Sequence, residues 1–122
     1  MSLKDCKQTC YECLCACENC FMNCVKMKCP NLEHMRSCLK YCRMCCVVCK
    51  CCIEACCNCN LEIIKCICEA CVKACSKCAK ECGQHKNKHC QACAKACQKC
   101  VDICQKICFE KKTKKSKKTK KN

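Results

Sequence analysis

The run CQACAKACQKCVDIC, residues 90–104, places cysteines at successive steps of three, four, three and four residues. Residues three or four apart share one face of a helix, with Cβ atoms about 5–6 Å apart. Two sulfur atoms on such a face can approach to about 4–5 Å, which is twice a metal–sulfur bond. Thiolates select the soft metals Zn(II), Cu(I) and iron–sulfur clusters. The spacing therefore predicts a metal-binding helix face.

Four segments of the chain share this rhythm, and we take the cysteines in register as candidate metal ligands. The first two segments contain Cys6, Cys10, Cys13, Cys17, Cys20, Cys24 and then Cys38, Cys42, Cys45, Cys49, Cys52, Cys56, Cys59. The last two contain Cys68, Cys71, Cys75, Cys78, Cys82 and then Cys90, Cys93, Cys97, Cys100, Cys104, Cys108. Cys46 is also a candidate ligand, because it forms a CxxxC pair with Cys42.

Five cysteines depart from the stripe when each residue is turned by about 100° on a helical wheel. Cys15 and Cys66 should face outward. Cys46 and Cys57 lie about 100–120° to one side of their stripe, and Cys51 flanks its other side. The outward cysteines are left out of the candidate ligands, and the sequence assigns them no role.

The breaks between the segments fall where helices should end. Cys29-Pro30-Asn31 separates the first two segments, with Asn31 as a helix N-cap. Asn58 and Asn60 lie at the second junction, before Leu61 and Ile64 in the register of the third stripe. Gly83, the only glycine, is placed to cap the third helix. Short connections make consecutive helices antiparallel, which predicts an all-α, up-down-up-down four-helix bundle with a cysteine-lined core over residues 1–110.

The composition argues against a disulfide-linked secreted scaffold. Thirty of the 122 residues are cysteine, but one glycine and one proline are too few for a loop-rich fold. No apolar run has the length of a signal peptide or a membrane span, so we expect a cytoplasmic protein with reduced thiols.

The formal net charge of +15 is concentrated at the C-terminal end. Residues 111–121 carry eight lysines and no acid, which leaves +7 for the rest of the chain. We expect residues 111–122 to form a disordered tail that aids solubility or binds nucleic acid or anionic membranes through charge alone. No aromatic residue lies among the lysines, so specific recognition of nucleic acid is not expected.

A continuous ladder of thiols favours Cu(I) over zinc, because zinc requires closed tetrahedral sets of four ligands. About 12 ions with two private thiolates each, or about 25 with shared thiolates, would fit 25 core cysteines. This number predicts storage or sequestration of multiple Cu(I) ions rather than an enzymatic reaction. The alternatives are a zinc- or mixed-metal-buffering metallothionein-like protein, a thiol redox enzyme and a lysine-tail nucleic-acid binder.

The runs ICEACVKACSKCAKEC, residues 67–82, and CGQHKNKHCQACAKACQKC, residues 82–100, resemble the cytosolic copper storage proteins of bacteria. The resemblance implies a four-helix bundle that stores many Cu(I) ions, forms a homotetramer and catalyses no reaction. It also implies that His85 and His89, before the fourth helix, lie at the mouth through which copper passes. Asn87 stands where the family can carry another histidine.

The topology independently predicts one such mouth, because the first and third connections of an up-down-up-down bundle lie at the same end. The first connection contains Met27, Cys29, His34 and Met35, and the third contains His85 and His89. All three histidines should therefore gather at one end, with the chain termini and the lysine-rich tail at the other. Imidazole and thioether groups bind Cu(I) more weakly than a thiolate core does, which suits transfer.

Overall fold

The chain folds into four long helices in the computed structural model. The structure describes the backbone of residues 3–26, 35–58 and 60–121, and side chains as far as residue 108. The helices are α1 Leu3–Val25, α3 Arg36–Asn58, α4 Leu61–Gly83 and α5 Lys88–Lys121. The described ranges contain no strand, and none of their helices combines the length and apolar character needed to cross a membrane.

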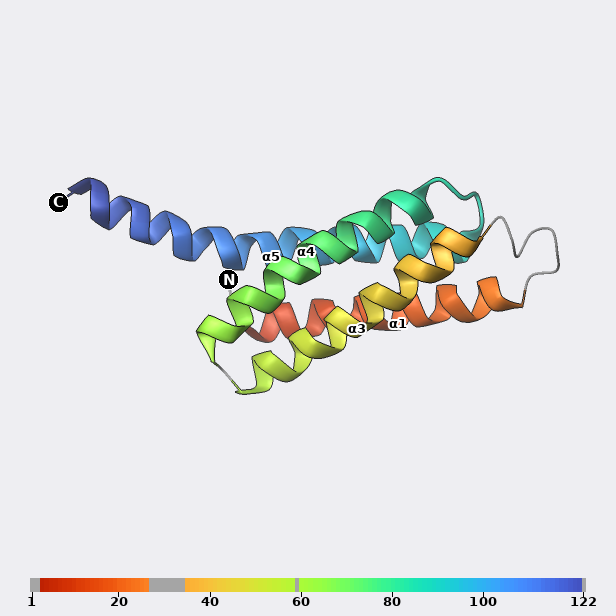
Figure 1. Ribbon diagram of the computed structural model, residues 1–122, viewed down its shortest axis with the longest axis horizontal. Coiled ribbons are helices and arrows are strands. Elements are labelled where there is room, and N and C mark those ends of the chain that lie inside the picture. The colour runs from red at the N-terminus through yellow and green to blue at the C-terminus, as the bar shows by residue number, and fades with distance from the viewer. Residues whose placement is uncertain (1–2, 27–34, 59, 122) are drawn as a thin grey trace.

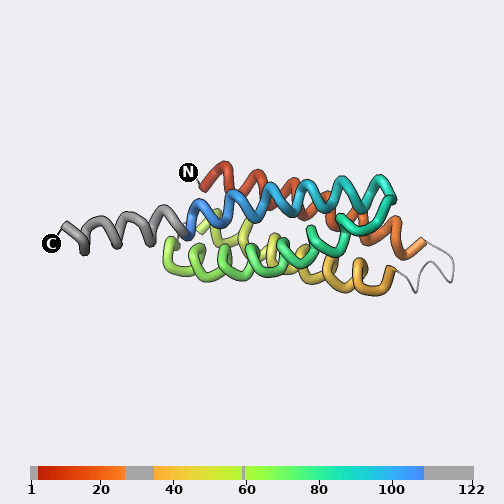
Figure 2. The backbone as a smooth tube through the Cα atoms, turned by 90° about the horizontal axis from the view of Figure 1, so that it is seen from above, coloured from red at the N-terminus to blue at the C-terminus, as the bar shows by residue number. Residues whose placement is uncertain are grey.

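The helices pack as the antiparallel bundle that the sequence predicts. Helix α3 packs against α1 and α4, and α5 packs against α4 and α1, which closes a ring of four helices. Figure 2 shows α1 and α5 in one layer and α3 and α4 in the other. In Figure 1, the end of α1, the start of α3 and the α4–α5 turn all lie at one end of the bundle. The start of α1 and the α3–α4 junction lie at the opposite end.

The α3–α4 junction is closed by a helix cap. Asn60 is the N-cap of α4, and its side-chain oxygen accepts a hydrogen bond of 3.1 Å from the backbone N–H of Ile63. Such a bond satisfies one of the backbone donors left open at the start of a helix. The expected cap at Asn31 lies outside the described residues, as do Met27, Cys29, His34 and Cys59.

Helix α4 ends at Gly83, as expected, but not through the left-handed glycine that commonly caps helices. Gln84 is the capping residue and is itself right-handed, with φ −79°. Its N–H bonds to the carbonyl of Glu81 at 3.2 Å, and the N–H of His85 bonds to the carbonyl of Cys82 at 3.1 Å. A tightened last turn therefore satisfies the carbonyls, so no left-handed residue is required.

The core consists almost entirely of cysteine. Every stripe cysteine among the described residues is buried, and most are fully buried. Ile64 continues the α4 stripe and is fully buried, whereas Leu61, at the first turn of α4, is 47% exposed. Cys15 and Cys66 face solvent, as predicted, and so do Cys51 and Cys57.

The predicted boundary at residue 110 falls within α5, whose backbone continues to Lys121. Side chains from residue 109 onward lie outside the described part of the chain. The division into a bundle and a lysine-rich tail therefore stays a prediction.

Candidate metal centre: a column of thiols

A column of sulfur atoms runs along the axis of the bundle, formed by inward-facing cysteines of all four helices. Among the described residues, 24 cysteines are buried and four are exposed. The three- and four-residue steps keep each stripe on one helix face, and the ring of helices turns the four faces toward one another. Free thiols here occupy the places that leucine or isoleucine would hold in an ordinary bundle.

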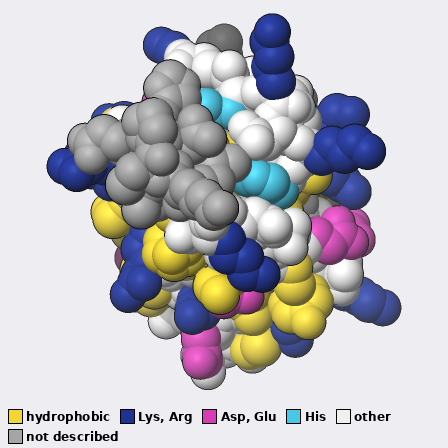
Figure 3. All heavy atoms as spheres, turned by 90° about the vertical axis from the view of Figure 1, so that its right-hand side faces the viewer, with side chains coloured by type: hydrophobic (Ala, Val, Ile, Leu, Met, Phe, Trp, Pro, Cys, Tyr) yellow, Lys and Arg dark blue, Asp and Glu magenta, His cyan; other side chains and the backbone are white. Residues whose placement is uncertain are grey.

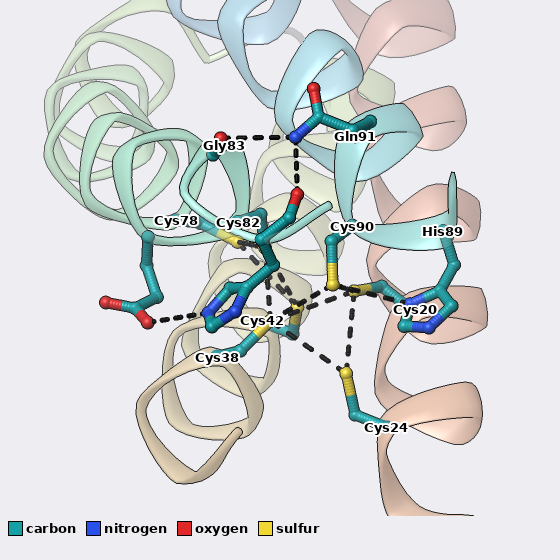
Figure 4. Close-up of polar contacts among 12 residues, drawn as sticks. Cys20, Cys24, Cys38, Cys42, Cys78, Cys82, Gly83, His89, Cys90 and Gln91 are labelled. Atoms are coloured by element: carbon teal, nitrogen blue, oxygen red, sulfur yellow. Dashed lines mark hydrogen bonds and ion pairs between the residues drawn. The ribbon is translucent and has the colours of Figure 1, made fainter. Parts of the chain in front are cut away.

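The thiols nearest the α4–α5 turn form a connected group drawn from four helices. Cys20 lies 3.9 Å from Cys24, 3.9 Å from Cys38 and 3.8 Å from Cys90, measured between Sγ atoms. Cys38 lies 3.4 Å from Cys82 on the facing helix. Figure 4 shows these sulfur atoms converging on one region between the helices.

The middle of the column is at least as dense. Cys45 lies 3.2 Å from Cys75, 3.6 Å from Cys13 and 3.7 Å from Cys97. Cys17 lies 3.6 Å from Cys97, which links this group to the thiols nearer the α4–α5 turn. Each pair joins different helices, so an ion bound here would cross-link the bundle.

The column continues toward the start of α1. Cys10 lies 3.8 Å from Cys100, and Cys6 lies 3.8 Å from Cys52, which in turn lies 3.9 Å from Cys68. The thiols thus form a series of neighbours over the length of the bundle rather than separate cages.

Several groups of four thiols have all their sulfur atoms within 4.8 Å of one another. They include Cys6/Cys10/Cys52/Cys104, Cys13/Cys45/Cys49/Cys75, Cys13/Cys17/Cys45/Cys97, Cys17/Cys78/Cys93/Cys97 and Cys20/Cys42/Cys82/Cys93. Cys13, Cys17 and Cys93 each belong to two of these groups. A zinc site needs four private ligands, so these overlapping groups cannot all be closed zinc sites at once.

The distances also bear on coordination number. Three sulfur atoms at about 2.3 Å from one ion lie about 4.0 Å apart, and two in a line lie about 4.6 Å apart. The Sγ–Sγ contacts within hydrogen-bonding range run from 3.2 to 4.0 Å. The arrangement therefore suits three-coordinate or sulfur-bridged soft ions with little movement, and the wider pairs of the four-thiol groups, up to 4.8 Å apart, leave room for linear coordination as well.

Hydrogen bonds between thiols shift their pKa values in both directions. The thiol of Cys10, with other neighbours, lowers the pKa of Cys6 to about 5 and that of Cys49 to about 7. Desolvation acts the other way and raises the pKa of Cys24 to about 11. A donated hydrogen bond stabilises a thiolate, whereas burial without one destabilises it. The column therefore contains thiols that readily ionise beside thiols that hold their protons.

Three candidate ligands sit at the margin of the column. Cys46 is 8% exposed and Cys56 is 5% exposed, in contrast to their fully buried neighbours. Cys108 is 7% exposed, and its thiol bonds to the backbone carbonyl of Lys65 at 3.8 Å. These residues lie at the edges of the column, and their role as ligands stays a prediction. Cys59 lies outside the described residues.

Both described histidines lie at the end of the bundle formed by the α4–α5 turn. Nδ1 of His89 lies 3.5 Å from Sγ of Cys90, which is part of the first thiol group. Figure 3 shows histidine atoms reaching the surface of this end. Met35, predicted for the same end, is buried at 2% exposure.

Two residues that the sequence reasoning missed hold His85 in place. Nε2 of His85 donates to Oε2 of Glu81 at 3.0 Å, since a carboxylate can only accept. The Gln91 side chain donates to the carbonyls of Gly83 and His85, at 3.1 and 2.5 Å (Figure 4). The four-residue spacing of Glu81 and His85 was the available signal, although His85 lies just beyond the end of α4.

Comparison with known proteins agrees with this geometry. Residues 1–109 match the profile of the copper storage protein family. The chain belongs to the copper storage protein family. Its function is accordingly copper storage, and the thiol column is the structural feature of the chain suited to it. A search of curated proteins found no match to this copper storage protein.

Solved structures of other copper storage proteins share its fold. The Cu(I)-bound protein BsCsp3 is 33% identical, with a TM-score of 0.81 over 86% of this chain and 96% of that chain. The apo form of copper storage protein 3 from Bacillus subtilis is also 33% identical, with a TM-score of 0.79 over 86% and 97%. A cytosolic copper storage protein from Streptomyces lividans, with five coppers, is 25% identical, with a TM-score of 0.82 over 88% and 92%.

The desolvated thiols predict how the stability of the reduced, metal-free protein depends on pH. The pKa of Cys24 rises from 9.0 to about 11 on folding, so the unfolded chain releases this proton first. The contribution of Cys24 to the free energy of unfolding should therefore be level below pH 9 and fall between pH 9 and about 11. Urea unfolding across this range measures the slope. Cys24→Ala should reduce it, and an identical slope in the variant would contradict the assignment.

Proposed function

We propose that the chain holds Cu(I) ions in series along the thiol column and loads them through the end of the bundle that carries His85 and His89. The observation that carries this proposal is the unbroken succession of buried sulfur atoms from Cys24 at that end to Cys6 at the other. Soft thiolates suit a monovalent d¹⁰ ion, which tolerates shared ligands and variable geometry.

The number of thiols supports storage rather than the transfer of single ions. One Cu(I) ion needs two or three thiolates, whereas 24 cysteines are buried among the described residues. All candidate cysteine ligands that the structure describes lie within or at the margin of the column, including Cys46. Each bound ion displaces thiol protons, so loading should release protons to solvent.

The mouth of the store is the surface around His85 and His89. His89 contacts Cys90, and Cys90 lies within 4.0 Å of both Cys20 and Cys38, so an ion held by the imidazole is one step from the column. Imidazole is a weaker ligand for Cu(I) than thiolate is, which allows release in either direction. Glu81 orients His85, as partners behind a metal-binding histidine commonly do.

Replacing both mouth histidines with alanine should slow the loading and release of Cu(I) by about tenfold or more while leaving the final capacity nearly unchanged. Stopped-flow transfer between the protein and a chromophoric Cu(I) chelator measures both rates. Glu81→Gln should slow transfer less than the double alanine variant does, because glutamine keeps the shape but weakens the hydrogen bond. A large loss of capacity in the histidine variant would refute the role of a mouth.

We propose further that the protein acts in the cytoplasm as a homo-oligomer, a tetramer by family resemblance, and catalyses no reaction. Exposed apolar side chains on α1 and α4 supply surfaces for self-association. They include Tyr11 and Val25 on α1 and Leu61 and Ile63 on α4, each between 45% and 55% exposed. Sedimentation of the reduced protein tests this proposal, and a monomer at micromolar concentration would refute it.

A further inference from the structure

A groove of about 490 Å³ opens between α1 and α3. It is lined by Glu18, Phe21, Met22, Arg43, Cys46, Val47 and Lys50. Two contacts between the helices frame it: the Arg43 guanidinium lies 5.9 Å from the Phe21 ring centre, and Lys50 lies 4.0 Å from the Glu18 carboxylate. These contacts hold the two helices together on either side of an opening.

Cys46 connects this groove to the thiol column. Its side chain lines the groove yet is only 8% exposed, so most of it is turned away from solvent. On the inner side, Cys46 shares a face of α3 with the fully buried Cys42 and Cys49, which lie four residues before it and three residues after it. Its thiol also interacts with that of Cys17 on α1. Cys17 is fully buried and belongs to two of the four-thiol groups at the middle of the column.

The outer part of the groove offers a second soft ligand. Met22 lines the same groove from α1 and is 55% exposed, so its thioether is accessible from outside. Thioether and thiol groups both select Cu(I). Met22, Cys46 and Cys17 thus form a series of decreasing exposure: an exposed thioether, a nearly buried thiol and a fully buried core thiol.

We propose that this groove is a second access route for Cu(I), in which Met22 and Cys46 receive an ion from a small anionic thiolate complex and Cys17 passes it into the middle of the column. This inference rests on the proposed storage function and adds a side route to the mouth. It accounts for a cysteine that lies off the α3 stripe and yet remains next to a core thiol.

The chemistry is ligand exchange without any change of oxidation state. The Cys46 sulfur forms a bond to Cu(I) and one carrier sulfur leaves the ion, taking the proton that Cys46 gives up. In a second exchange the Cys17 thiol binds the ion and gives its proton to the remaining carrier sulfur, which leaves, so that Cys46 and Cys17 hold the ion between them. Arg43 and Lys50 outweigh the single carboxylate of Glu18 in charge, which favours an anionic complex over a bare cation. The groove volume also lies in the range of pockets that hold small molecules.

The test compares loading rates from a Cu(I)–glutathione complex in five variants. Met22→Leu/Cys46→Ala removes both groove ligands. Met44→Leu/Cys51→Ala is the matched control, because both residues are exposed on α3 and neither lines the groove. Each pair is placed in the native chain and in the His85→Ala/His89→Ala background. Val47→Trp narrows the groove without removing a ligand. It is included in case Met22→Leu/Cys46→Ala slows loading only because that variant folds poorly.

In the background without mouth histidines, removing the groove ligands should slow the remaining loading by about tenfold, and Val47→Trp should slow it in the same direction. The control pair should leave the rate within about twofold in both backgrounds. An unchanged loading rate in the groove variants would overturn the side route. The storage function would still stand if the native chain fills to its normal capacity. Failure of the native chain to bind Cu(I) at all would overturn the storage function instead.

Discussion

Reduced and metal-free, the chain should take up between about 12 and 25 Cu(I) ions, against no more than about 6 Zn(II) ions. The difference arises because Cu(I) accepts two or three thiolates and shares them, whereas zinc closes a site with four. Cys13, Cys17 and Cys93 each serve two of the four-thiol groups, so tetrahedral sites compete for the same ligands. Titration against a competing chelator, followed by metal analysis of the desalted protein, counts the ions directly.

The two metals should also differ in how they affect the fold. Cu(I) fits sulfur atoms already 3.2 to 4.0 Å apart, so circular dichroism should show strong helicity before loading and little change after it. A metallothionein-like protein would instead be largely unfolded without metal. A metal-free protein without helicity, or a zinc capacity equal to that for copper, would favour the metallothionein-like alternative.

Removing one four-thiol group from the middle of the column should lower the Cu(I) capacity by about two to four ions. The substitutions are Cys13→Ala, Cys17→Ala, Cys45→Ala and Cys97→Ala, which take sulfur from three of the four helices. Two ions are lost if each thiol pair holds its own ion, and more are lost if the thiols are shared. The metal-free variant should also lose about 1 kcal/mol of stability per buried side chain.

The exposed cysteines provide a matched control with the same number and type of substitutions. Replacing Cys15, Cys51, Cys57 and Cys66 with alanine should leave the capacity within about one ion and change stability by no more than about 0.5 kcal/mol per site. Metal analysis and urea unfolding of both quadruple variants make the comparison. Equal losses of copper in the two variants would show that position in the column does not determine binding.

The helical content and the direction of each cysteine could be predicted because both depend on local periodicity. The three- and four-residue steps place Cys6 to Cys24 on one face of α1 whatever surrounds that helix, and the same geometry turns Cys15 outward. Leu61 shows the limit of this reasoning. It shares the register of Ile64, yet it lies at the first turn of α4 and is 47% exposed, because register does not say where the bundle ends.

The turn before α5 shows a second limit. Gly83 marks the end of α4 correctly, but the cap is made by Gln84 and by the hydrogen bonds of His85 and Gln91. A glycine in a sequence indicates where a left-handed residue is tolerated, not where one is used. The pairing of Glu81 with His85 likewise required the turn of the chain that brings the imidazole back over its own helix.

The sequence by itself determined that this chain forms four helices, that each carries a stripe of thiols, and that the stripes suit soft metal ions. Each of these properties follows from residue type and spacing within one helix. The tertiary structure alone decided which thiols meet across helices, such as Cys45 with Cys75 and Cys17 with Cys97, and that Cys46 joins the column to a surface groove. Such contacts depend on the rotation and axial shift of one helix against another, and these are set by packing between residues far apart in the chain.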